Sequence, residues 1–342
     1  MASTAMLAEA LEAPVAVARQ LAANAPLCRA IGERLRAEPP RFVATGARGS
    51  SDTAASFAKY LIEIRLGLAT ASLGPSICSV YGVRPKLADA LFLAVSQSGR
   101  SPDLLSLAAA ARAGGAATLA LVNEAQSPLA AACEWHLPLL AGPERSVAAT
   151  KSWIASLAAI LQLVACWSED GALLAATSRL PDDLAAAAAA DWSEAAGLLD
   201  QSGDLFVVGR GPGYAAAQEI ALKLKETAGL HAEAYSAAEL MHGPMTLAGR
   251  NFPVLALSQE DAALPGMVEL VELLLARQVP VAVVGPAACK GAIALPLAAG
   301  LHPFAAPIAM VQSFYPLVER IARERGRDPD RPPHLSKVTE TM

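Results

Sequence analysis

The sequence predicts an α/β protein with two mainly parallel sheets, on three observations. Short apolar runs typical of strands alternate with longer helical patterns along the 342 residues. Polar or glycine-rich stretches follow several of these runs directly, as at residues 46–51, 96–101 and 209–213. A similar order of elements recurs after about 160 residues, which indicates a duplicated α/β domain. We therefore expect two tandem domains, each a three-layer αβα sandwich.

In the first half, the apolar runs 41–45, 91–95 and 117–122 predict strands. Helices are expected after the first strand to about residue 66, over 101–113 and over 147–167. The apolar stretch 153–167 is short for a membrane span and is followed by polar residues, so we interpret it as a buried helix.

In the second half, strands are expected at 205–208, 253–257 and 279–284. One helix opens at 209–213 and runs to about residue 226, and a last helix over 303–323 is expected to be broken by prolines. The match of Phe42 to Phe206, Ser96 to Ser258 and Val122 to Val284 supports the duplication. The predicted organisation is an N-terminal helical segment (1–40), two domains (41–180 and 181–330) and a C-terminal tail (331–342).

Composition narrows the function classes. Hydrophobic residues make up 54% and charged residues 17%, and the net charge of −5 without a basic cluster argues against a nucleic-acid partner. Five cysteines without a CxxC pair indicate reduced, structural thiols in a cytoplasmic protein. Five histidines without HxH or HExxH spacing argue against a metal site, and we expect no cofactor. Glu9 and Glu12 favour an amphipathic first helix over a signal peptide, and we expect no membrane partner.

The stretch SQSGRS, residues 96–101, carries hydroxyl and amide groups at a strand end, where ligands bind in open α/β sheets. Ser101 and Pro102 are typical of a helix start, and a helix N-terminus favours anions. Without a GKS or GKT sequence, the loop indicates a small phosphorylated metabolite rather than nucleotide hydrolysis. The alternative is a polar turn that only caps a helix. The phosphate ligands that we expect are Ser96, Gln97, Ser98 and Ser101.

The second half keeps Ser258 and Gln259 at the matching position but loses the serine cluster and the glycine. We therefore hypothesise that the two halves divide the labour. The helix after residue 213 places Glu219, Lys223 and Glu226 at i, i+4 and i+7, on one face. The alternative for that face is a solvated stripe of ion pairs.

Five motifs, in order, resemble the SIS (sugar isomerase) domain family, including the tandem-SIS isomerase half of glucosamine-6-phosphate synthase and its glutaminase-lacking relatives. The motifs are GARGSSD (46–52), SQSGRSPD (96–103), AATKSW (148–153), ALKLKETAGLHAEAY with ELMHGP (221–235 and 239–244) and HLSKVTE (334–340).

The resemblance implies roles for single residues. Glu226 would carry the proton between C1 and C2 of a sugar, and Lys223 would position the carboxylates. His242 would assist ring opening from the neighbouring subunit, which implies a homodimer. Lys337 would form an imine with the open-chain ketose. Ser51 and Glu219 would hold the sugar. Without the resemblance, a histidine before Gly-Pro is more often structural, and a lysine in a polar tail is commonly a solvent residue.

Three departures from the family pattern stand out. Arg100 replaces an acid after SQSG, Ser101 replaces a threonine and keeps the hydroxyl, and Ala149 replaces a serine expected near the phosphate. Only about 40 residues precede the first strand, so we expect no glutaminase domain.

The resulting expectation is an enzyme that converts glucosamine 6-phosphate to fructose 6-phosphate and ammonia. The alternatives are another substrate such as galactosamine 6-phosphate, a non-catalytic regulator that binds a sugar phosphate, and an apolar scaffold subunit.

Overall fold

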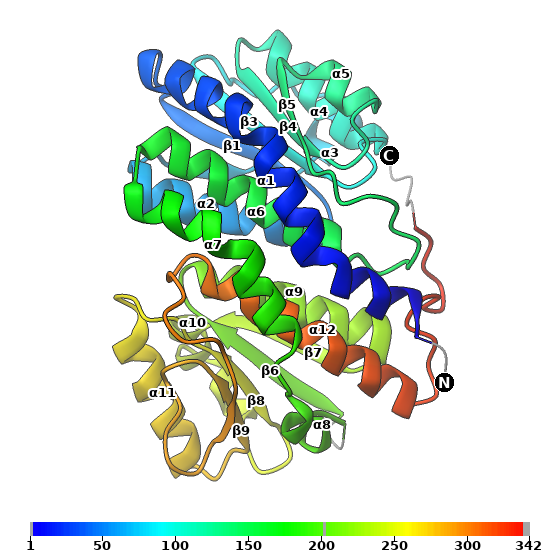
Figure 1. Ribbon diagram of the computed structural model, residues 1–342, viewed down its shortest axis with the longest axis vertical. Coiled ribbons are helices and arrows are strands. Elements are labelled where there is room, and N and C mark those ends of the chain that lie inside the picture. The colour runs from blue at the N-terminus through cyan, green and yellow to red at the C-terminus, as the bar shows by residue number, and fades with distance from the viewer. Residues whose placement is uncertain (1–2, 201–202, 338–342) are drawn as a thin grey trace. The chain divides into compact units, whose positions relative to one another are not determined.

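The computed structural model describes residues 3–200 and 203–337, which form two compact units built from discontinuous segments (Figure 1). The β1–β5 unit comprises residues 12–144, 151–181 and 335–342, and the β6–β10 unit comprises residues 1–11, 145–150 and 182–334. Two unit boundaries fall inside helices, α1 (Ala5–Ala37) and α7 (Gly171–Ala188). The continuous domain boundaries of the sequence analysis stay a prediction.

The sheet of the β1–β5 unit is entirely parallel, with strand order β2-β1-β3-β4-β5. Its strands are β1 (Phe42–Gly46), β2 (Thr70–Ser72), β3 (Ala90–Ser96), β4 (Ala117–Val122) and β5 (Trp135–Pro138). Its helices are α2 (Ser50–Leu66), α3 (Ser76–Ser79), α4 (Pro102–Ala113), α5 (Pro128–Ala132) and α6 (Lys151–Ser168). Strand β3 is buried along its whole length, as a central parallel strand covered on both faces must be.

The sheet of the β6–β10 unit is also parallel and has the order β10-β9-β8-β6-β7, which read backwards is the order of the first sheet. Its strands are β6 (Asp204–Gly209), β7 (His231–Ser236), β8 (Val254–Leu257), β9 (Val281–Val284) and β10 (Ile293–Leu295). Its helices are α8 (Ser193–Asp200), α9 (Pro212–Lys223), α10 (Ala237–Met241), α11 (Leu264–Ala276) and α12 (Ala306–Glu324). The shared topology confirms the duplication.

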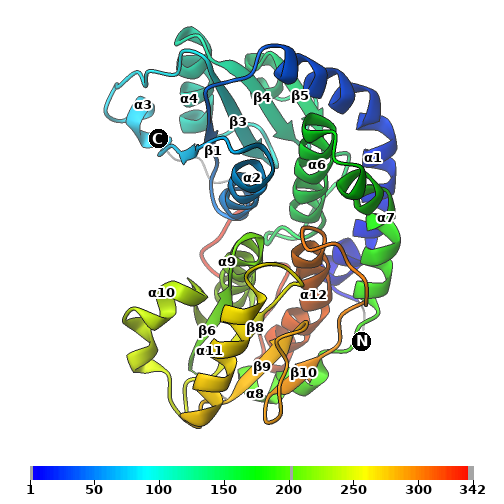
Figure 2. The same cartoon turned by 90° about the vertical axis from the view of Figure 1, so that its left-hand side faces the viewer.

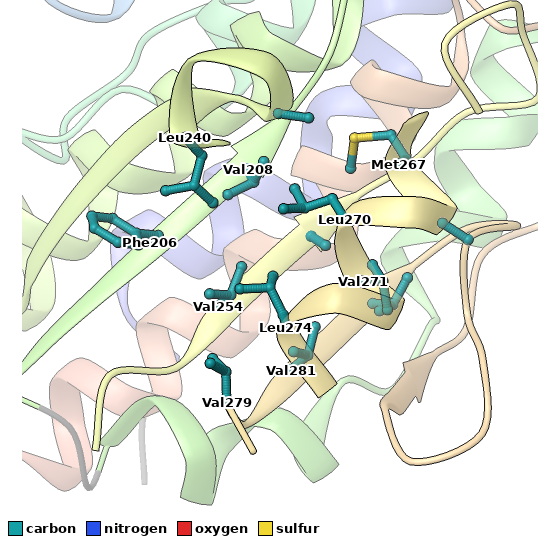
Figure 3. Close-up of a cluster of buried hydrophobic side chains, with 14 of the residues drawn as sticks. Phe206, Val208, Leu240, Val254, Met267, Leu270, Val271, Leu274, Val279 and Val281 are labelled. Atoms are coloured by element: carbon teal, nitrogen blue, oxygen red, sulfur yellow. The ribbon is translucent and has the colours of Figure 1, made fainter. Parts of the chain in front are cut away.

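Helices cover the two sheets in the same way. In the first unit, α2 packs against α6, while α4 and α5 pack on the sheet through a separate core cluster (Figure 2). In the second unit, α9 packs against α12, while Met267, Leu270 and Leu274 of α11 contact β6, β8 and β9 (Figure 3). Burial of these apolar side chains, at about 25 cal/mol per Å² of apolar surface removed from water, is the main force that holds each sandwich together.

Two helices differ from their prediction. The helix expected from residue 147 begins at Lys151, and the Val147 N–H donates to the Asp330 carbonyl instead of lying in a first helical turn. The helix expected to break at prolines continues through Pro316, since tertiary packing of its buried face outweighs one lost backbone hydrogen bond. By length and composition α6 could cross a membrane, but 94% of it is buried, which confirms the interpretation as a buried helix.

Candidate functional site

The loop of residues 96–101, here the hydroxyl loop, follows β3 and leads into α4. Gly99 has a φ of 62°, and its N–H donates to the Ser96 hydroxyl at 3.0 Å. A Cβ at Gly99 would lie 2.3 Å from Oγ of Ser127. The tight turn therefore requires glycine at this position.

The other polar side chains of the loop differ from Ser96 in exposure. Gln97, Ser98 and Ser101 are each partly exposed, whereas Ser96 is buried. Ser101 occupies the N-cap position of α4 as predicted, but its side chain makes no capping hydrogen bond. The first turn of the twelve-residue helix α4 adds backbone N–H groups and a partial positive charge. This set of donors suits a phosphate group.

A second loop, at the end of the neighbouring strand β1, is tied to the start of α4. Nε and Nη2 of Arg48 donate to Oδ2 of Asp103 at 2.9 and 2.6 Å. The Asp103 side chain is fully buried, so this ion pair compensates a carboxylate that would otherwise be costly to bury. Ser51 lies in the first turn of α2 and is partly exposed. The structure thus places Ser51 at the start of α2, just after the strand that neighbours β3. The Arg48–Asp103 pair was not predicted from the sequence.

In the β6–β10 unit, Lys223 joins the two predicted carboxylates. Its Nζ lies 3.3 Å from Oε1 of Glu219 and 2.6 Å from Oε2 of Glu226. Glu219 and Lys223 are fully buried, which excludes the alternative of a solvated ion-pair stripe for them. Burial alone would lower the pKa of Lys223, but the carboxylates of Glu219 and Glu226 outweigh it and raise that pKa. Lys223 is therefore a charged lysine that fixes both carboxylates.

Glu226 differs from the other two in its backbone and exposure. The α-helix ends at Lys223 and continues as a π-helical turn over Leu224–Ala228, whereas the predicted α-helix runs to about residue 226. Such turns are rare and are frequent at functional sites. The Glu226 side chain keeps 24% of its surface exposed while it is bound to Lys223. It is the one carboxylate of the three-residue cluster that a ligand can reach.

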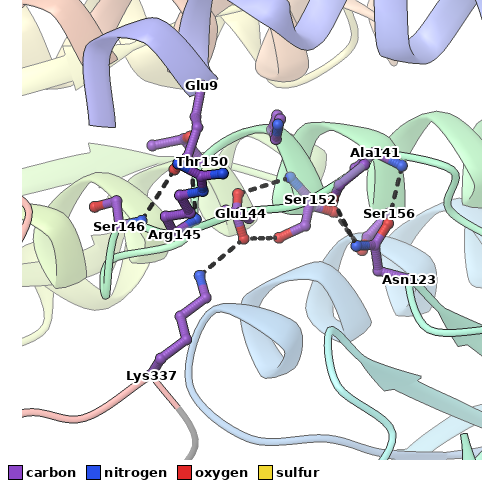
Figure 4. Close-up of polar contacts among 12 residues, drawn as sticks. Glu9, Asn123, Ala141, Glu144, Arg145, Ser146, Thr150, Ser152, Ser156 and Lys337 are labelled. Atoms are coloured by element: carbon purple, nitrogen blue, oxygen red, sulfur yellow. Dashed lines mark hydrogen bonds and ion pairs between the residues drawn. The ribbon is translucent and has the colours of Figure 1, made fainter. Parts of the chain in front are cut away.

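His242 and Lys337 lie in different units and have different surroundings. His242 ends α10 and is exposed, directly before Gly243 and a 3₁₀ turn over Pro244–Leu247. Lys337, in the β1–β5 unit, donates from Nζ to Oε2 of the buried Glu144 at 3.1 Å (Figure 4). Glu144 was missed from the sequence because 193 residues separate the two partners.

The loop after β8 has the same place in its sheet as the hydroxyl loop, but its Ser258 hydroxyl and its Gln259 side-chain N–H bond within the protein. The Ser258 hydroxyl donates to the Val284 carbonyl and accepts from the Ala287 N–H, both at 2.9 Å. Nε2 of Gln259 donates to the Arg210 carbonyl and to Asp261. A cavity of about 340 Å³ at this edge is lined by Glu260 and mainly apolar residues, without a basic side chain, and is poorly suited to phosphate.

All five cysteines are free, and burial raises the pKa of Cys28 to about 12 and of Cys133 to about 11. Both buried thiols are therefore protonated and unreactive near neutral pH. Within residues 3–200 and 203–337, no group of three or more His, Cys, Asp or Glu side chains is arranged to hold a metal ion.

Comparisons with known proteins identify relatives along nearly the whole chain. The chain is 33% identical over 97% of its length to glutamine–fructose-6-phosphate aminotransferase [isomerizing] of Methanothermobacter thermautotrophicus, of which the match covers 56%. The chain spans about half the length of the curated relatives that it matches.

Two solved structures superpose closely. One is a proposed phosphosugar isomerase from Silicibacter pomeroyi DSS-3, with 43% identity and a TM-score of 0.91, covering 96% of this chain and all of that one. The other is the C-terminal domain of glucosamine-fructose-6-phosphate aminotransferase from Francisella tularensis, with 25% identity and a TM-score of 0.83, covering 97% and 99%. The SIS domain profile matches residues 36–166 and 198–287, more than half of the chain. The chain belongs to the SIS domain family.

Proposed function

We propose that the protein is a phosphosugar isomerase and deaminase that converts glucosamine 6-phosphate and water to fructose 6-phosphate and ammonia. The observation that carries the proposal is the Glu226 carboxylate, partly exposed on a π-helical turn and held 2.6 Å from a buried lysine. A proton shuttle needs a base that is fixed in place yet accessible to substrate. The similarity to proteins named for fructose-6-phosphate amination and sugar-phosphate isomerisation supports the reaction class.

Each step of the proposed reaction uses its own set of residues. Ser96, Gln97, Ser98 and Ser101 supply the donors for the phosphate, and Ser51 contacts the sugar. His242 moves a proton during ring opening to the aldehyde. Glu226 then removes the C2 proton and returns it at C1, which leaves an imine at C2. Hydrolysis of that imine forms the ketone and releases ammonia.

Glu219 takes a supporting role in this proposal. Its side chain has no exposed surface, and its Oε1 lies 3.3 Å from Nζ of Lys223. We therefore assign Glu219 to holding Lys223, which in turn holds Glu226, rather than to a direct contact with the sugar.

Assembly and location belong to the same proposal. His242 is exposed, and the nearby Met241 and Leu247 expose 39% and 61% of their surface. Apolar side chains exposed beside a polar one favour a protein contact, and we propose a homodimer in which this face meets the partner subunit. The free cysteines favour the cytoplasm.

The test is ammonia release from glucosamine 6-phosphate by purified protein, with Glu226→Gln and a matched control. Glu272 is an exposed acid on α11, so Glu272→Gln changes the charge by the same amount away from the proposed base. We expect Glu226→Gln to lose about 100-fold to 10,000-fold in kcat and the control to retain activity. Equal activity of Glu226→Gln and the control would remove Glu226 from the mechanism.

The substrate is tested with a panel of sugar phosphates that includes galactosamine 6-phosphate. Faster turnover of another member would change the substrate assignment. Binding without turnover of any member would reject the enzyme and favour the non-catalytic regulator.

A further inference from the structure

A buried carboxylate, Glu144, lies at the start of α6 in the β1–β5 unit. Its side chain has no exposed surface, and it accepts hydrogen bonds from Ser152 through the backbone N–H at 3.2 Å and the hydroxyl at 2.6 Å (Figure 4). Ser152 lies in the first turn of α6, where the helix dipole stabilises a negative charge. The carboxylate is therefore held in one position from the helix side.

The third contact of this carboxylate is the amine of the C-terminal tail. Nζ of Lys337 donates to Oε2 of Glu144 at 3.1 Å, and the lysine side chain keeps 25% of its surface exposed. A buried carboxylate is stable only with a compensating charge or donors. Glu144 therefore fixes the amine at one end while the amine stays accessible to a ligand.

Hydrogen bonds connect this contact to the hydroxyl loop. The Asn123 N–H donates to the Gln97 carbonyl at 3.2 Å. The Asn123 side chain holds the segment before Glu144, accepting from the Ala141 N–H at 2.9 Å and donating to the Gly142 carbonyl at 3.0 Å. Since Asn123 directly follows β4, the contact lies at the same carboxyl edge of the sheet as the hydroxyl loop. The Lys337 amine and the hydroxyl loop thus lie at the same edge of the β1–β5 sheet.

We propose that Glu144 is the positioning residue and proton acceptor for Lys337. The inference rests on the proposed function and on the role that the SIS resemblance implies for Lys337, which is to form an imine with the open-chain ketose phosphate. An ammonium cannot attack a carbonyl, so the lysine must first become neutral. A carboxylate in direct contact with Nζ is placed to take that proton and to return it.

The proton balance of the step closes. Glu144 takes one proton from the Lys337 ammonium, and the neutral amine adds to C2 of fructose 6-phosphate, forming a C–N bond and a carbinolamine. The carbinolamine then loses its hydroxyl as water with the proton that Glu144 returns. The products are a protonated imine, water and an ionised Glu144, so no oxidant or other co-reactant is required.

The experiment traps that imine with borohydride, using fructose 6-phosphate as the probe and intact-protein mass as the readout. Glu144→Gln keeps the shape and the acceptor for Ser152 but removes the base, whereas Glu144→Asp keeps the carboxylate. The exposed Glu134 supplies the matched control, Glu134→Gln. Lys337→Arg removes the reactive amine and is expected to give no adduct.

The expected result is that Glu144→Gln slows adduct formation by about 100-fold, within the range for acid–base groups. The dissociation constant of fructose 6-phosphate is expected to change less than threefold. Glu144→Asp should recover part of the rate although Gln is the closer match in size, which a purely structural role would not predict. Equal trapping by wild type and Glu144→Gln would overturn the proposal, as would an adduct on another residue or none at all.

Failure of this inference is distinguishable from failure of the proposed function. If the protein forms the Lys337 adduct in a Glu144-dependent way but releases no ammonia from glucosamine 6-phosphate, the deaminase is rejected and the role of Glu144 stands. If the protein releases ammonia and Glu144→Gln forms the Lys337 adduct as fast as wild type, the role of Glu144 is rejected and the deaminase stands.

Discussion

The loops after β3 and β8 have equivalent places in two sheets of the same topology, and they use their polar groups in opposite ways. In the hydroxyl loop, Gln97, Ser98 and Ser101 are partly exposed, and Ser101 does not cap its helix. In the loop after β8, Ser258 and Gln259 are buried and bonded to backbone carbonyls of their own unit. Side chains that already have internal partners gain little from a ligand, because a new hydrogen bond must replace an old one.

The two copies of this duplicated fold differ in where they place polar and charged side chains. The β1–β5 unit presents hydroxyls and backbone donors, whereas the β6–β10 unit buries the cluster of Glu219, Lys223 and Glu226. Substitutions in matched positions of the two units are therefore expected to affect different observables.

The largest effect is expected from Lys223→Met, which leaves Glu219 buried without its cation. Removing one partner of a buried ion pair costs about 3–5 kcal/mol, so the free energy of unfolding should fall by that amount and turnover should be lost. Urea denaturation followed by circular dichroism measures the change. The double variant Lys223→Met with Glu219→Leu should be more stable than Lys223→Met alone, and a double variant of equal or lower stability would contradict the assigned pairing.

The same cluster predicts a pH dependence of stability. The pKa of Lys223 is raised in the folded protein, so its stabilisation is complete below the ordinary lysine value of 10.5 and is lost as the pH rises through the raised value. Wild type should lose stability above about pH 10.5 more steeply than Lys223→Met. Parallel curves for the two proteins would argue against a charged Lys223.

Gly99→Ala and Gly285→Ala compare the hydroxyl loop with the turn directly after β9, which lies against Ser258 of the loop after β8. Alanine at Gly99 would combine a φ of 62° with a Cβ 2.3 Å from Oγ of Ser127, and alanine at Gly285 a φ of 90° with a Cβ 2.0 Å from the Ser258 carbonyl oxygen. Each is expected to cost about 1–3 kcal/mol of stability. Only Gly99→Ala should also weaken binding of fructose 6-phosphate, by about 100-fold in calorimetry, because it displaces the hydroxyl loop. Equal affinity for both variants would show that the two edges do not differ in this way.

The sequence predicted the elements and loops well but not the long-range contacts. Strand ends, the glycine at 99 and the helix start at Pro102 all have local signals in residue type and spacing. Arg48 and Asp103 are 55 residues apart, and Glu144 and Lys337 are 193 apart, so nothing local indicates either pair. The π-helical turn at Glu226 was missed because the i, i+4, i+7 spacing describes a regular α-helix equally well.

Removing one hydroxyl from the hydroxyl loop and one from the loop after β8 should affect different measurements, with smaller effects than the glycine substitutions. Ser98→Ala is expected to raise the KM for the sugar phosphate about tenfold, the size of one hydrogen bond to a charged group, and to leave the melting temperature unchanged. Ser258→Ala is expected to leave KM unchanged and to destabilise the protein by about 1–3 kcal/mol, since the Ala287 N–H and the Val284 carbonyl lose their partner. The reverse pattern would mean that the second loop binds the phosphate.

The smallest effect is expected from Arg100, the residue that replaces an acid of the family pattern in the hydroxyl loop. Arg100 is exposed, so solvent and salt screen its attraction to a phosphate. Arg100→Glu should raise KM only about threefold to tenfold at low salt, and the difference from wild type should disappear near 0.5 M salt. Arg84 is also an exposed arginine of this unit but lies outside the hydroxyl loop, so Arg84→Glu controls for net charge. A KM for Arg100→Glu that stays high at 0.5 M salt would identify Arg100 as a direct phosphate ligand and make the hydroxyl loop more unlike its counterpart after β8.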